Sequence, residues 1–219
     1  MINTLEIESV LLEFGKKRVL QDVYLKCETD KVTGMLGRNG TGKTCLMNIM
    51  CGTLVPGSHS VRLNQKSILS TLRSSKDIMY LPQFKFIPKS LTLKRIFKDF
   101  NLNFSQFVID FPDFEKYYKS KIKKLSGGEQ RIIEIYIILK SKTKFCLLDE
   151  PFSHVMPVHV DTIKKIIFSE KKNKGILITD HLYKHIIDIC DDLYVINDGK
   201  TWLTESVADI ETHGYVKKE

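Results

Sequence analysis

A glycine-rich loop contains the first residues that could carry out chemistry. The pattern GxxxxGK[ST] is filled by Gly37, Arg38, Asn39, Gly40, Thr41, Gly42, Lys43 and Thr44. Glycines let successive backbone N–H groups turn toward one anion, and a following helix adds the positive end of its dipole. We therefore expect Lys43 to reach the β- and γ-phosphates of a nucleotide and Thr44 to ligate Mg²⁺. A glycine turn that binds nothing is disfavoured, because an apolar strand precedes the loop and a helix follows it.

Two carboxylates form the second candidate group. Asp149 and Glu150 directly follow an apolar segment, residues 145–148, that reads as a strand. Ligands of open α/β sheets bind at the carboxyl ends of the strands. We expect Asp149 to complete the Mg²⁺ shell and Glu150 to activate the attacking water as general base. Without a phosphate loop in the same chain, two solvated acids after a strand would be the better interpretation.

The third candidate is a serine–glycine segment, Leu125-Ser126-Gly127-Gly128-Glu129-Gln130, at the start of an expected helix. A serine hydroxyl and two glycines at a helix N-terminus can bind a second anion. Ser126 and Glu129 can also form a structural capping box, and the two roles are compatible. Because one chain then carries two phosphate sites, the pattern suggests that two chains share nucleotides.

Apolar strands and helices alternate around these segments. Two alternating stretches, 4–14 and 19–27, are expected to flank a turn at Gly15-Lys16-Lys17. Further strands are expected over 31–36, 61–63, 78–81, 145–148, 175–179 and 193–196, and helices over 43–51, 128–140, 158–171 and 182–190. Gly52 is expected to end the first helix, and Asn197-Asp198-Gly199-Lys200 to form a hairpin turn. The alternation predicts an α/β fold in which helices wrap a parallel sheet.

The composition changes between the two halves of this α/β body. Residues 84–114 hold eight of the twelve phenylalanines. Six of them recur at spacings of three and four, which is helical periodicity: Phe97, Phe100, Phe104, Phe107, Phe111 and Phe114. Asn103 is expected to cap a helix at Phe104, and Pro112 to break it. We expect an inserted helical lobe with this stripe in its core; an exposed docking groove for a partner helix is the alternative.

Composition limits the class of protein. The net charge of +8 comes from scattered lysines without an arginine-rich block, so nucleic-acid binding is not expected. No apolar run approaches the ~18 residues that cross a bilayer, and the first residues do not resemble a secretory signal. We therefore expect a cytosolic protein that a partner could hold at a membrane. The five scattered cysteines are expected to be reduced core thiols.

The ordered motifs resemble those of the nucleotide-binding subunits of ABC transporters over nearly the whole chain. The set is the phosphate loop, Gln83 in Tyr80-Leu81-Pro82-Gln83, the LSGGEQ segment, Asp149-Glu150-Pro151, and His181 in Thr179-Asp180-His181. The resemblance implies a P-loop NTPase of ABC type as a single domain over 1–219. Its core, with an N-terminal antiparallel β-subdomain, would comprise 1–83 and 141–219. Its helical subdomain, which includes the LSGGEQ segment, would comprise 84–140.

The resemblance also implies roles for single residues. Gln83 would sense Mg²⁺ and water, His181 would contact the γ-phosphate, and Phe14 would stack on adenine. Each has a plain structural alternative: a polar residue at a strand end, a neighbour of a helix cap, and a core aromatic. The binding set for the second half of the site would be Ser126, Gly127, Gly128 and Glu129.

The resemblance further implies an assembly. Two cassettes, as a homodimer or an ABC heterodimer, would pair head to tail with ATP between the phosphate loop of one and Ser126 and Gly128 of the other. Hydrolysis would drive a separate transmembrane permease. The chain would then lie on the cytoplasmic face of the inner or plasma membrane.

Two segments resemble a narrower group within the family. LLDEPF (147–152) and GILITDHL (175–182) are similar to the ATPases of lipopolysaccharide export and their relatives for branched-chain amino acids.

One position departs from the family pattern. Val155-Met156 stands where the family usually places Leu-Asp before proline, and Met156 cannot accept the hydrogen bonds that this Asp makes across the dimer. Ser153 or His154 could substitute for the missing Asp.

Two alternative functions stay open: a soluble ABC ATPase acting on ribosomes or DNA, and a slow, nucleotide-gated regulatory module, which Met156 suggests. The absence of a second cassette and of long coiled coils argues against the first, and Glu150 and His181 argue against the second.

Overall fold

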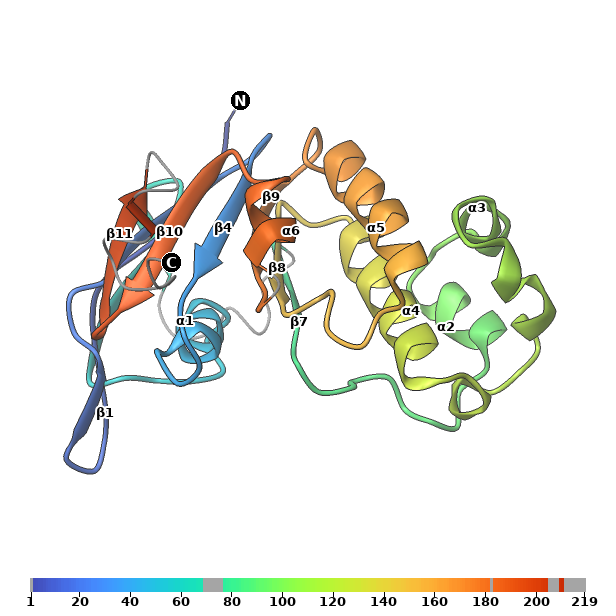
Figure 1. The fold of residues 1–219 in the computed structure, drawn as a ribbon, viewed down its shortest axis with the longest axis horizontal. Helices are drawn as coiled ribbons and strands as arrows, with labels where there is room; N and C mark the ends of the chain where they lie inside the picture. Colours follow the sequence, from blue (N-terminus) through green and yellow to red (C-terminus); the bar gives the residue numbers. More distant parts are fainter. Residues whose placement is uncertain (1, 69–76, 182, 205–208, 211–219) are drawn as a thin grey trace, which may run out of the picture.

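The computed structural model describes residues 2–68, 77–181, 183–204 and 209–210 (Figure 1). Its strands are β1 (Thr4–Phe14), β2 (Lys17–Leu20), β3 (Tyr24–Glu28), β4 (Val32–Leu36), β5 (Ser58–Leu63), β6 (Lys66–Ser67), β7 (Ile78–Leu81), β8 (Phe145–Asp149), β9 (Gly175–Thr179), β10 (Asp192–Asn197) and β11 (Lys200–Thr204). Its α-helices are α1 (Lys43–Met50), α2 (Leu93–Asp99), α3 (Phe104–Asp110), α4 (Gly127–Lys140), α5 (Pro157–Glu170) and α6 (Tyr183–Ile187). Two 3-10 helices cover Pro112–Tyr117 and Ile122–Lys124.

The main sheet confirms the predicted parallel α/β core. Its strand order is β11-β10-β4-β9-β8-β7, and every neighbouring pair is parallel except β10 and β11. All residues of β4, β8 and β9 are buried, as expected for strands covered on both faces. The carboxyl ends of β4, β9, β8 and β7 therefore meet along one edge of the sheet.

A second, antiparallel sheet forms around β1, which pairs with β2, β3 and β5, while β6 pairs with β5. The prediction of one strand over 19–27 is wrong, because β2 ends at Leu20 and β3 begins at Tyr24. The interruption has a long-range cause: the backbone N–H of Gln21 donates to Gly199 O at 2.9 Å, and its side-chain amide donates to Asp198 O at 3.0 Å. The turn between β10 and β11 thus holds this segment away from continuous pairing.

The last predicted helix, 182–190, is shorter in the structure. Its first residue, Leu182, lies outside the described residues, and α6 ends at Ile187. Beyond it, Asp191 makes two bonds to Val32 at the start of β4, one through its N–H and one through its carboxylate, both at 2.8 Å. These bonds fix the chain at the amino-terminal end of β4, next to the point where β10 begins at Asp192.

The phenylalanine-rich segment folds as predicted. Asn103 caps α3, its side-chain oxygen accepting from Ser105 N at 2.8 Å, and Pro112 opens a 3-10 helix after α3 ends. Phe107 is fully buried, and its ring centroid lies within 4.8–5.8 Å of those of Phe97, Phe104, Phe111, Phe114 and Tyr136. The stripe is therefore the core of the lobe, with Phe100 as the 38% exposed exception. In Figure 1 this lobe lies beyond α4 and α5, on the side away from the sheets.

We expect Phe107→Ala to lower the free energy of unfolding by about 3–5 kcal/mol, because it leaves a cavity inside a closed ring cluster. Urea unfolding followed by circular dichroism measures the change. Phe100→Ala in the same lobe is the matched control and should cost about 1 kcal/mol or less, since its side chain is partly in water. Equal losses at the two positions would contradict a core centred on Phe107.

The remaining sequence expectations concern thiols and membrane spans. All five cysteines are free, and burial raises the pKa of the Cys27 and Cys51 thiols to about 12. Within the described part of the chain, no helix combines the length and the apolar character that a bilayer span needs.

Candidate functional site

The glycine-rich loop connects β4 to α1 and has the backbone shape that its glycines allow. Gly40 and Gly42 have φ values of 78° and 103°, which L-residues with side chains rarely adopt. At Gly37 a Cβ atom would lie 2.4 Å from Ile196 Cγ2 and 2.8 Å from Ile196 O, so the strand β10 leaves no room for a side chain. The glycines thus shape a loop at the N-terminus of α1 where backbone N–H groups can bind an anion, although the N–H of Thr41 donates to Arg38 O at 3.3 Å in this structure.

Lys43 lies buried beneath this loop. Its Nζ donates to Gly37 O at 2.6 Å and to Arg38 O at 3.1 Å. Burial lowers the pKa of the Lys43 ammonium, and the carboxylates of Glu150 and Asp149 partly oppose that shift. The carbonyls of the phosphate loop thus already orient the ammonium, next to the acidic residues Asp149 and Glu150.

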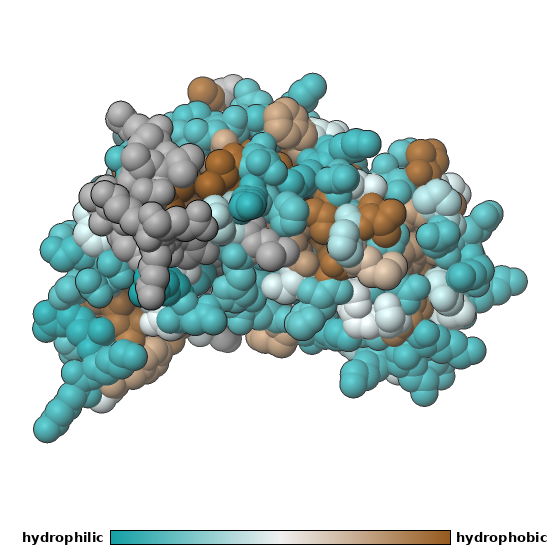
Figure 2. Space-filling view, viewed as in Figure 1, coloured by the Kyte–Doolittle hydropathy of each residue, from teal (hydrophilic) through white to brown (hydrophobic). Residues whose placement is uncertain are grey.

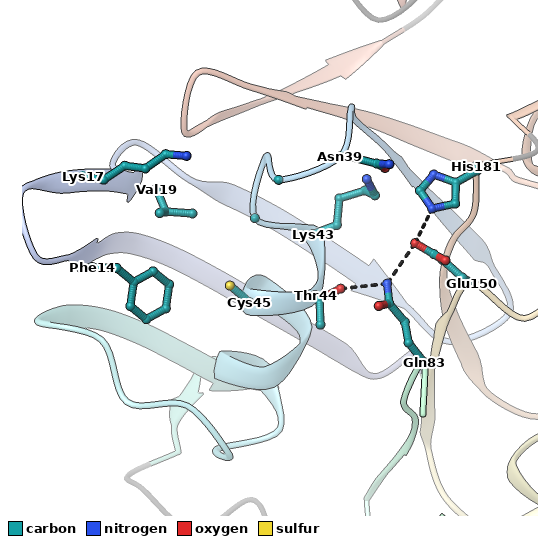
Figure 3. Close-up of a pocket in the computed structure, with 12 residues that line it drawn as sticks. Phe14, Lys17, Val19, Asn39, Lys43, Thr44, Cys45, Gln83, Glu150 and His181 are labelled. Atoms are coloured by element: carbon teal, nitrogen blue, oxygen red, sulfur yellow. Dashed lines mark hydrogen bonds and ion pairs between the residues drawn. The ribbon is translucent and has the colours of Figure 1, made fainter. Parts of the chain in front are cut away.

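Neighbouring parallel strands carry the other predicted residues to this loop (Figure 3). Gln83 follows β7, Glu150 follows β8, and His181 comes two residues after β9. Gln83 Nε2 lies 3.1 Å from Thr44 Oγ1 and 2.8 Å from Glu150 Oε1. His181 Nε2 lies 2.7 Å from the same Glu150 oxygen. The structure therefore brings Thr44, Gln83, Glu150 and His181 into one chain of polar contacts.

Asp149 is fully buried at the end of β8. Its carboxylate accepts a hydrogen bond from Tyr80 Oη at 3.0 Å and lies 3.4 Å from Gln83 Nε2. Burial raises the pKa of Asp149, and hydrogen bonds from Thr44, Tyr80 and Gln83 oppose the rise. The hydroxyl of Thr44 and this carboxylate are hard oxygen donors of the kind Mg²⁺ prefers, to be completed by phosphate oxygens and water. Among the described residues, no three His, Cys, Asp or Glu side chains form a metal cluster by themselves.

Glu150 has an unusual backbone for a residue with a side chain, with φ at 51°. Its N–H donates to Thr179 O at 2.8 Å, and Ser153 Oγ donates to Glu150 Oε2 at 3.4 Å. A left-handed residue costs free energy unless its surroundings hold it, and such residues cluster at functional sites. This turn directs the carboxylate toward Gln83 and His181.

A cavity of about 490 Å³ opens above the loop. Its lining is drawn in Figure 3 and comprises Phe14, Lys17, Val19, Asn39, Gly40, Gly42, Lys43, Thr44, Cys45, Gln83, Glu150 and His181. Phe14 is 54% exposed and does not belong to the core, which removes the plain structural alternative for it. The cavity is large enough for a nucleotide with its base toward the hairpin of β1 and β2 and its phosphates toward α1.

The serine–glycine segment lies elsewhere. Ser126 caps α4 in a capping box: Glu129 N donates to Ser126 Oγ at 3.2 Å, and Ser126 N donates to Glu129 Oε2 at 2.6 Å. The segment does not line the nucleotide-sized cavity, and α4 begins well to the side of α1 in Figure 1. A second cavity, of about 410 Å³, reaches Gly127 and is also bordered by Gln83 and Glu150. Within one chain the two predicted phosphate sites are therefore separate.

The departure from the family pattern occurs next to this segment. A Cβ atom at Gly128 would lie 2.5 Å from His154 O, so the start of α4 packs against the backbone after Glu150. Met156 is 56% exposed. His154 lines the second cavity and has a φ of 66°. The substitutes considered for the missing Asp, Ser153 and His154, thus both border the cavity that contains Glu150.

The sequence motifs did not point to several residues of the site, among them Tyr80, Lys17 and Arg131. Tyr80 bonds Asp149, Lys17 lines the cavity, and Arg131 donates to backbone carbonyls beside the acidic pair. Arg131 carried a signal, because a charged residue within the apolar stretch of α4 is costly to bury unless it is paired. Tyr80 and Lys17 carried none, since a strand tyrosine and a hairpin lysine are ordinary.

Known proteins are similar to this chain over most of its length. The family model described as ABC transporter matches residues 20–153. The chain is 32% identical to the lipopolysaccharide export system ATP-binding protein LptB of Haemophilus influenzae, over 99% of this chain and 96% of that protein. It is 24% identical to the high-affinity branched-chain amino acid transport ATP-binding protein BraG of Pseudomonas aeruginosa, over 97% of each.

Solved structures share the fold. An ATP-binding subunit of an ABC transporter superposes with a TM-score of 0.80 at 19% identity, over 96% of this chain and 94% of that one. A bacterial Atm1-family ABC exporter with ATP bound gives a TM-score of 0.82 at 16% identity, over 98% of this chain and 41% of the exporter.

Proposed function

The chain belongs to the ABC transporter family, and from that membership we propose how its residues bind ATP, hydrolyse it and drive a partner protein. It is an ATP-binding subunit of the transporter type, and its reaction is ATP hydrolysis. One observation carries the assignment of roles. The start of α1 and the segments after β7, β8 and β9 bring their side chains to one nucleotide-sized cavity: Lys43, Thr44, Gln83, Glu150 and His181.

ATP enters with its phosphates at the N-terminus of α1. The N–H groups of the 37–44 loop surround the phosphate oxygens, and Lys43 turns its ammonium from the loop carbonyls to the β- and γ-phosphates. Phe14 stacks on the adenine at the outer end of the cavity. Thr44, Asp149 and Gln83 would hold Mg²⁺, which would supply positive charge against the phosphates.

Glu150 and His181 act on the attacking water. Water oxygen forms the new bond to the γ-phosphorus, the bond between that phosphorus and the leaving ADP oxygen breaks, and Glu150 takes up the proton of the water. His181, 2.7 Å from Glu150, keeps the carboxylate aimed and contacts the γ-phosphate. The fixed geometry supplies most of the effect, because phosphoryl transfer depends on positioning and electrostatics.

A second cassette completes the site. Ser126 and Gly127 are exposed and do not line the nucleotide-sized cavity of their own chain, which supports a head-to-tail pair with ATP between one phosphate loop and Ser126, Gly127, Gly128 and Glu129 of the other copy. The pair is a homodimer or a heterodimer with a related cassette. The chain is a single ABC ATPase domain, with its helical subdomain over 84–140.

ATP hydrolysis drives a separate transmembrane permease, to which the chain binds at the cytoplasmic face of the membrane. The relatives LptB and BraG carry transport names, and this chain matches each over nearly its full length. One observation favours a second function, a slow nucleotide-gated regulatory module. Exposed Met156 stands where a hydrogen-bonding Asp would link the two halves of the dimer.

Two measurements test the proposal. The purified chain should turn over ATP in Mg²⁺ and stop when EDTA removes the metal. Affinity capture of the chain from detergent-solubilised membranes of its source cells should retain a protein with several membrane spans. If the chain hydrolyses ATP but the capture retains no membrane protein, a soluble ATPase is favoured. If the capture retains a membrane protein but the chain does not hydrolyse ATP, the regulatory module is favoured.

We expect Phe14→Ala to weaken ATP binding about tenfold, because stacking of a base on an aromatic ring is worth about 1–3 kcal/mol. Titration calorimetry with ATP measures the loss. Tripolyphosphate has no base, so its affinity should be the same for both proteins, and Phe14→Trp should restore ATP binding. Unchanged ATP affinity in Phe14→Ala would remove Phe14 from the site.

A further inference from the structure

Arg131 lies in α4, is 6% exposed, and makes its hydrogen bonds to the backbone of the catalytic strands. Its Nη1 donates to Pro82 O at 2.6 Å, the carbonyl just before Gln83. Its Nη2 donates to Asp149 O at 2.6 Å and lies 3.2 Å from Glu150 O. One guanidinium therefore ties together the ends of β7 and β8, next to the residues proposed to act on Mg²⁺ and water.

Glu134, one turn further along α4, extends this network. Its side chain is 1% exposed and lies 3.6 Å from Arg131 Nη1. Its Oε1 accepts from Phe86 N at 3.0 Å and from Ile87 N at 3.4 Å. The pair thus holds both the carbonyl before Gln83 and the amides just after it.

A buried ion pair of this kind is poorly explained by stability alone. The cost of removing two charges from water is often as large as the attraction between them, and apolar replacements can be equally stable. The bonds of Arg131 instead end on carbonyls whose direction sets the catalytic side chains. Glu150 in particular needs external support, because its φ of 51° is unfavourable for a residue with a side chain.

We propose that Arg131 is a positioning residue for ATP hydrolysis, through which α4 fixes the backbone that carries Gln83, Asp149 and Glu150. This proposal rests on the proposed role of Glu150 as general base. Arg131 does not line the nucleotide-sized cavity; it borders the second cavity, beside Gln83 and Glu150. It keeps Glu150 in the left-handed turn from which its carboxylate reaches the cavity.

The position of Arg131 gives the proposal a second consequence. α4 begins at the serine–glycine segment that would contact the nucleotide of the partner copy, and Arg131 follows Ser126 by five residues on the same rigid helix. Occupancy at Ser126 can therefore act on Glu150 of the same chain through Arg131. This route does not need the Asp that Met156 replaces.

The test uses the full-length protein and removes both charges at once. Arg131→Met with Glu134→Gln leaves no unpaired buried charge, so the variant should fold and bind ATP with unchanged Kd. Its kcat should fall about 100-fold, the size expected when a catalytic group is misplaced by about 1 Å. Glu134→Gln alone should lose much less, because Arg131 keeps its three carbonyls. Arg131→Lys should be intermediate, since lysine lacks the planar fork.

The chain offers a matched control. Lys140 and Glu170 form a partly buried ion pair at 2.8 Å at the other end of α4. Lys140→Met with Glu170→Gln should change the melting temperature by a similar amount and leave kcat unchanged. If this control loses as much kcat as the Arg131 variant, or if the Arg131 variant keeps the kcat of the unmodified protein, the proposal is wrong.

Two further outcomes separate this proposal from the proposed function. An unmodified protein that fails to hydrolyse ATP would overturn both. An active protein whose Arg131 variant is equally active would overturn the positioning role alone.

The route through α4 has its own test. Ser126→Ala should reduce kcat strongly in the unmodified protein and only weakly in the Arg131 and Glu134 double variant. If the losses in kcat from the two changes simply multiply, the route is refuted.

Discussion

Glu150→Gln should lower the rate of ATP hydrolysis about 1,000-fold, within the range that general-base catalysis contributes. Glutamine has the same shape but cannot accept the proton of the attacking water. Its side chain can still contact Gln83 and His181, which lie 2.8 and 2.7 Å from the Glu150 oxygen, so the site should keep its form. Release of inorganic phosphate under saturating MgATP measures the rate. Glu115→Gln, an exposed position in the helical lobe, is the control and should be fully active.

The same variant also tests the assembly. Because ATP is bound but not consumed, the Glu150→Gln protein should accumulate as a dimer around two nucleotides, seen as a doubled mass by light scattering. Addition of EDTA should return it to monomers.

Two results would contradict these expectations. A Glu150→Gln variant that keeps more than about a tenth of the hydrolysis rate would show that Glu150 is not the base. A variant that stays monomeric at saturating ATP would exclude a sandwich that forms without the membrane partner.

Lys43→Met should abolish hydrolysis and weaken ATP binding. The substitution keeps the length of the buried side chain but removes the charge that the 37–44 loop holds through Gly37 O and Arg38 O. Charge-assisted contacts to phosphate are worth about 1.5–3 kcal/mol each, so Kd for ATP should rise at least tenfold. Fluorescent-nucleotide binding and phosphate release measure the two effects separately.

Lys17→Met is the control for Lys43→Met. Lys17 lines the same cavity but is exposed on the β1–β2 hairpin, so its loss should change Kd only slightly. Circular dichroism should show the same fold for both variants. If Lys43→Met binds ATP as tightly as the unmodified protein, the ammonium does not contact the phosphates.

Hydrophilic residues cover much of the face in Figure 2, with apolar patches between them. The strands β8 and β9, which precede Glu150 and His181, are fully buried, whereas Gln83 and His181 are themselves exposed. The loop at 37–44 could be recognised because its glycines are required by local backbone geometry and by the close approach of Ile196. The acidic pair could be recognised because Asp149 and Glu150 directly follow the apolar run 145–148.

Other features could not be inferred from any local pattern. The order β4-β9-β8-β7, which makes Gln83, Glu150 and His181 neighbours, differs from the order along the chain. The break between β2 and β3 depends on bonds to Gly199 and Asp198, far along the sequence. The sequence marks Arg131 as a charged residue in an apolar helix, but its partners, the carbonyls of Pro82 and Asp149, lie 49 and 18 positions away and follow only from the fold.

The sequence by itself determined the family, the reaction and the residues that would bind phosphate, because these depend on motifs a few residues long whose steric and chemical demands are local. Only the tertiary structure decided how those motifs meet: Glu150 lies in a left-handed turn, Ser126 does not line the nucleotide-sized cavity of its own chain, and Arg131 of α4 bonds the ends of β7 and β8. Such contacts depend on how strands and helices pack, and packing is a property of the whole chain.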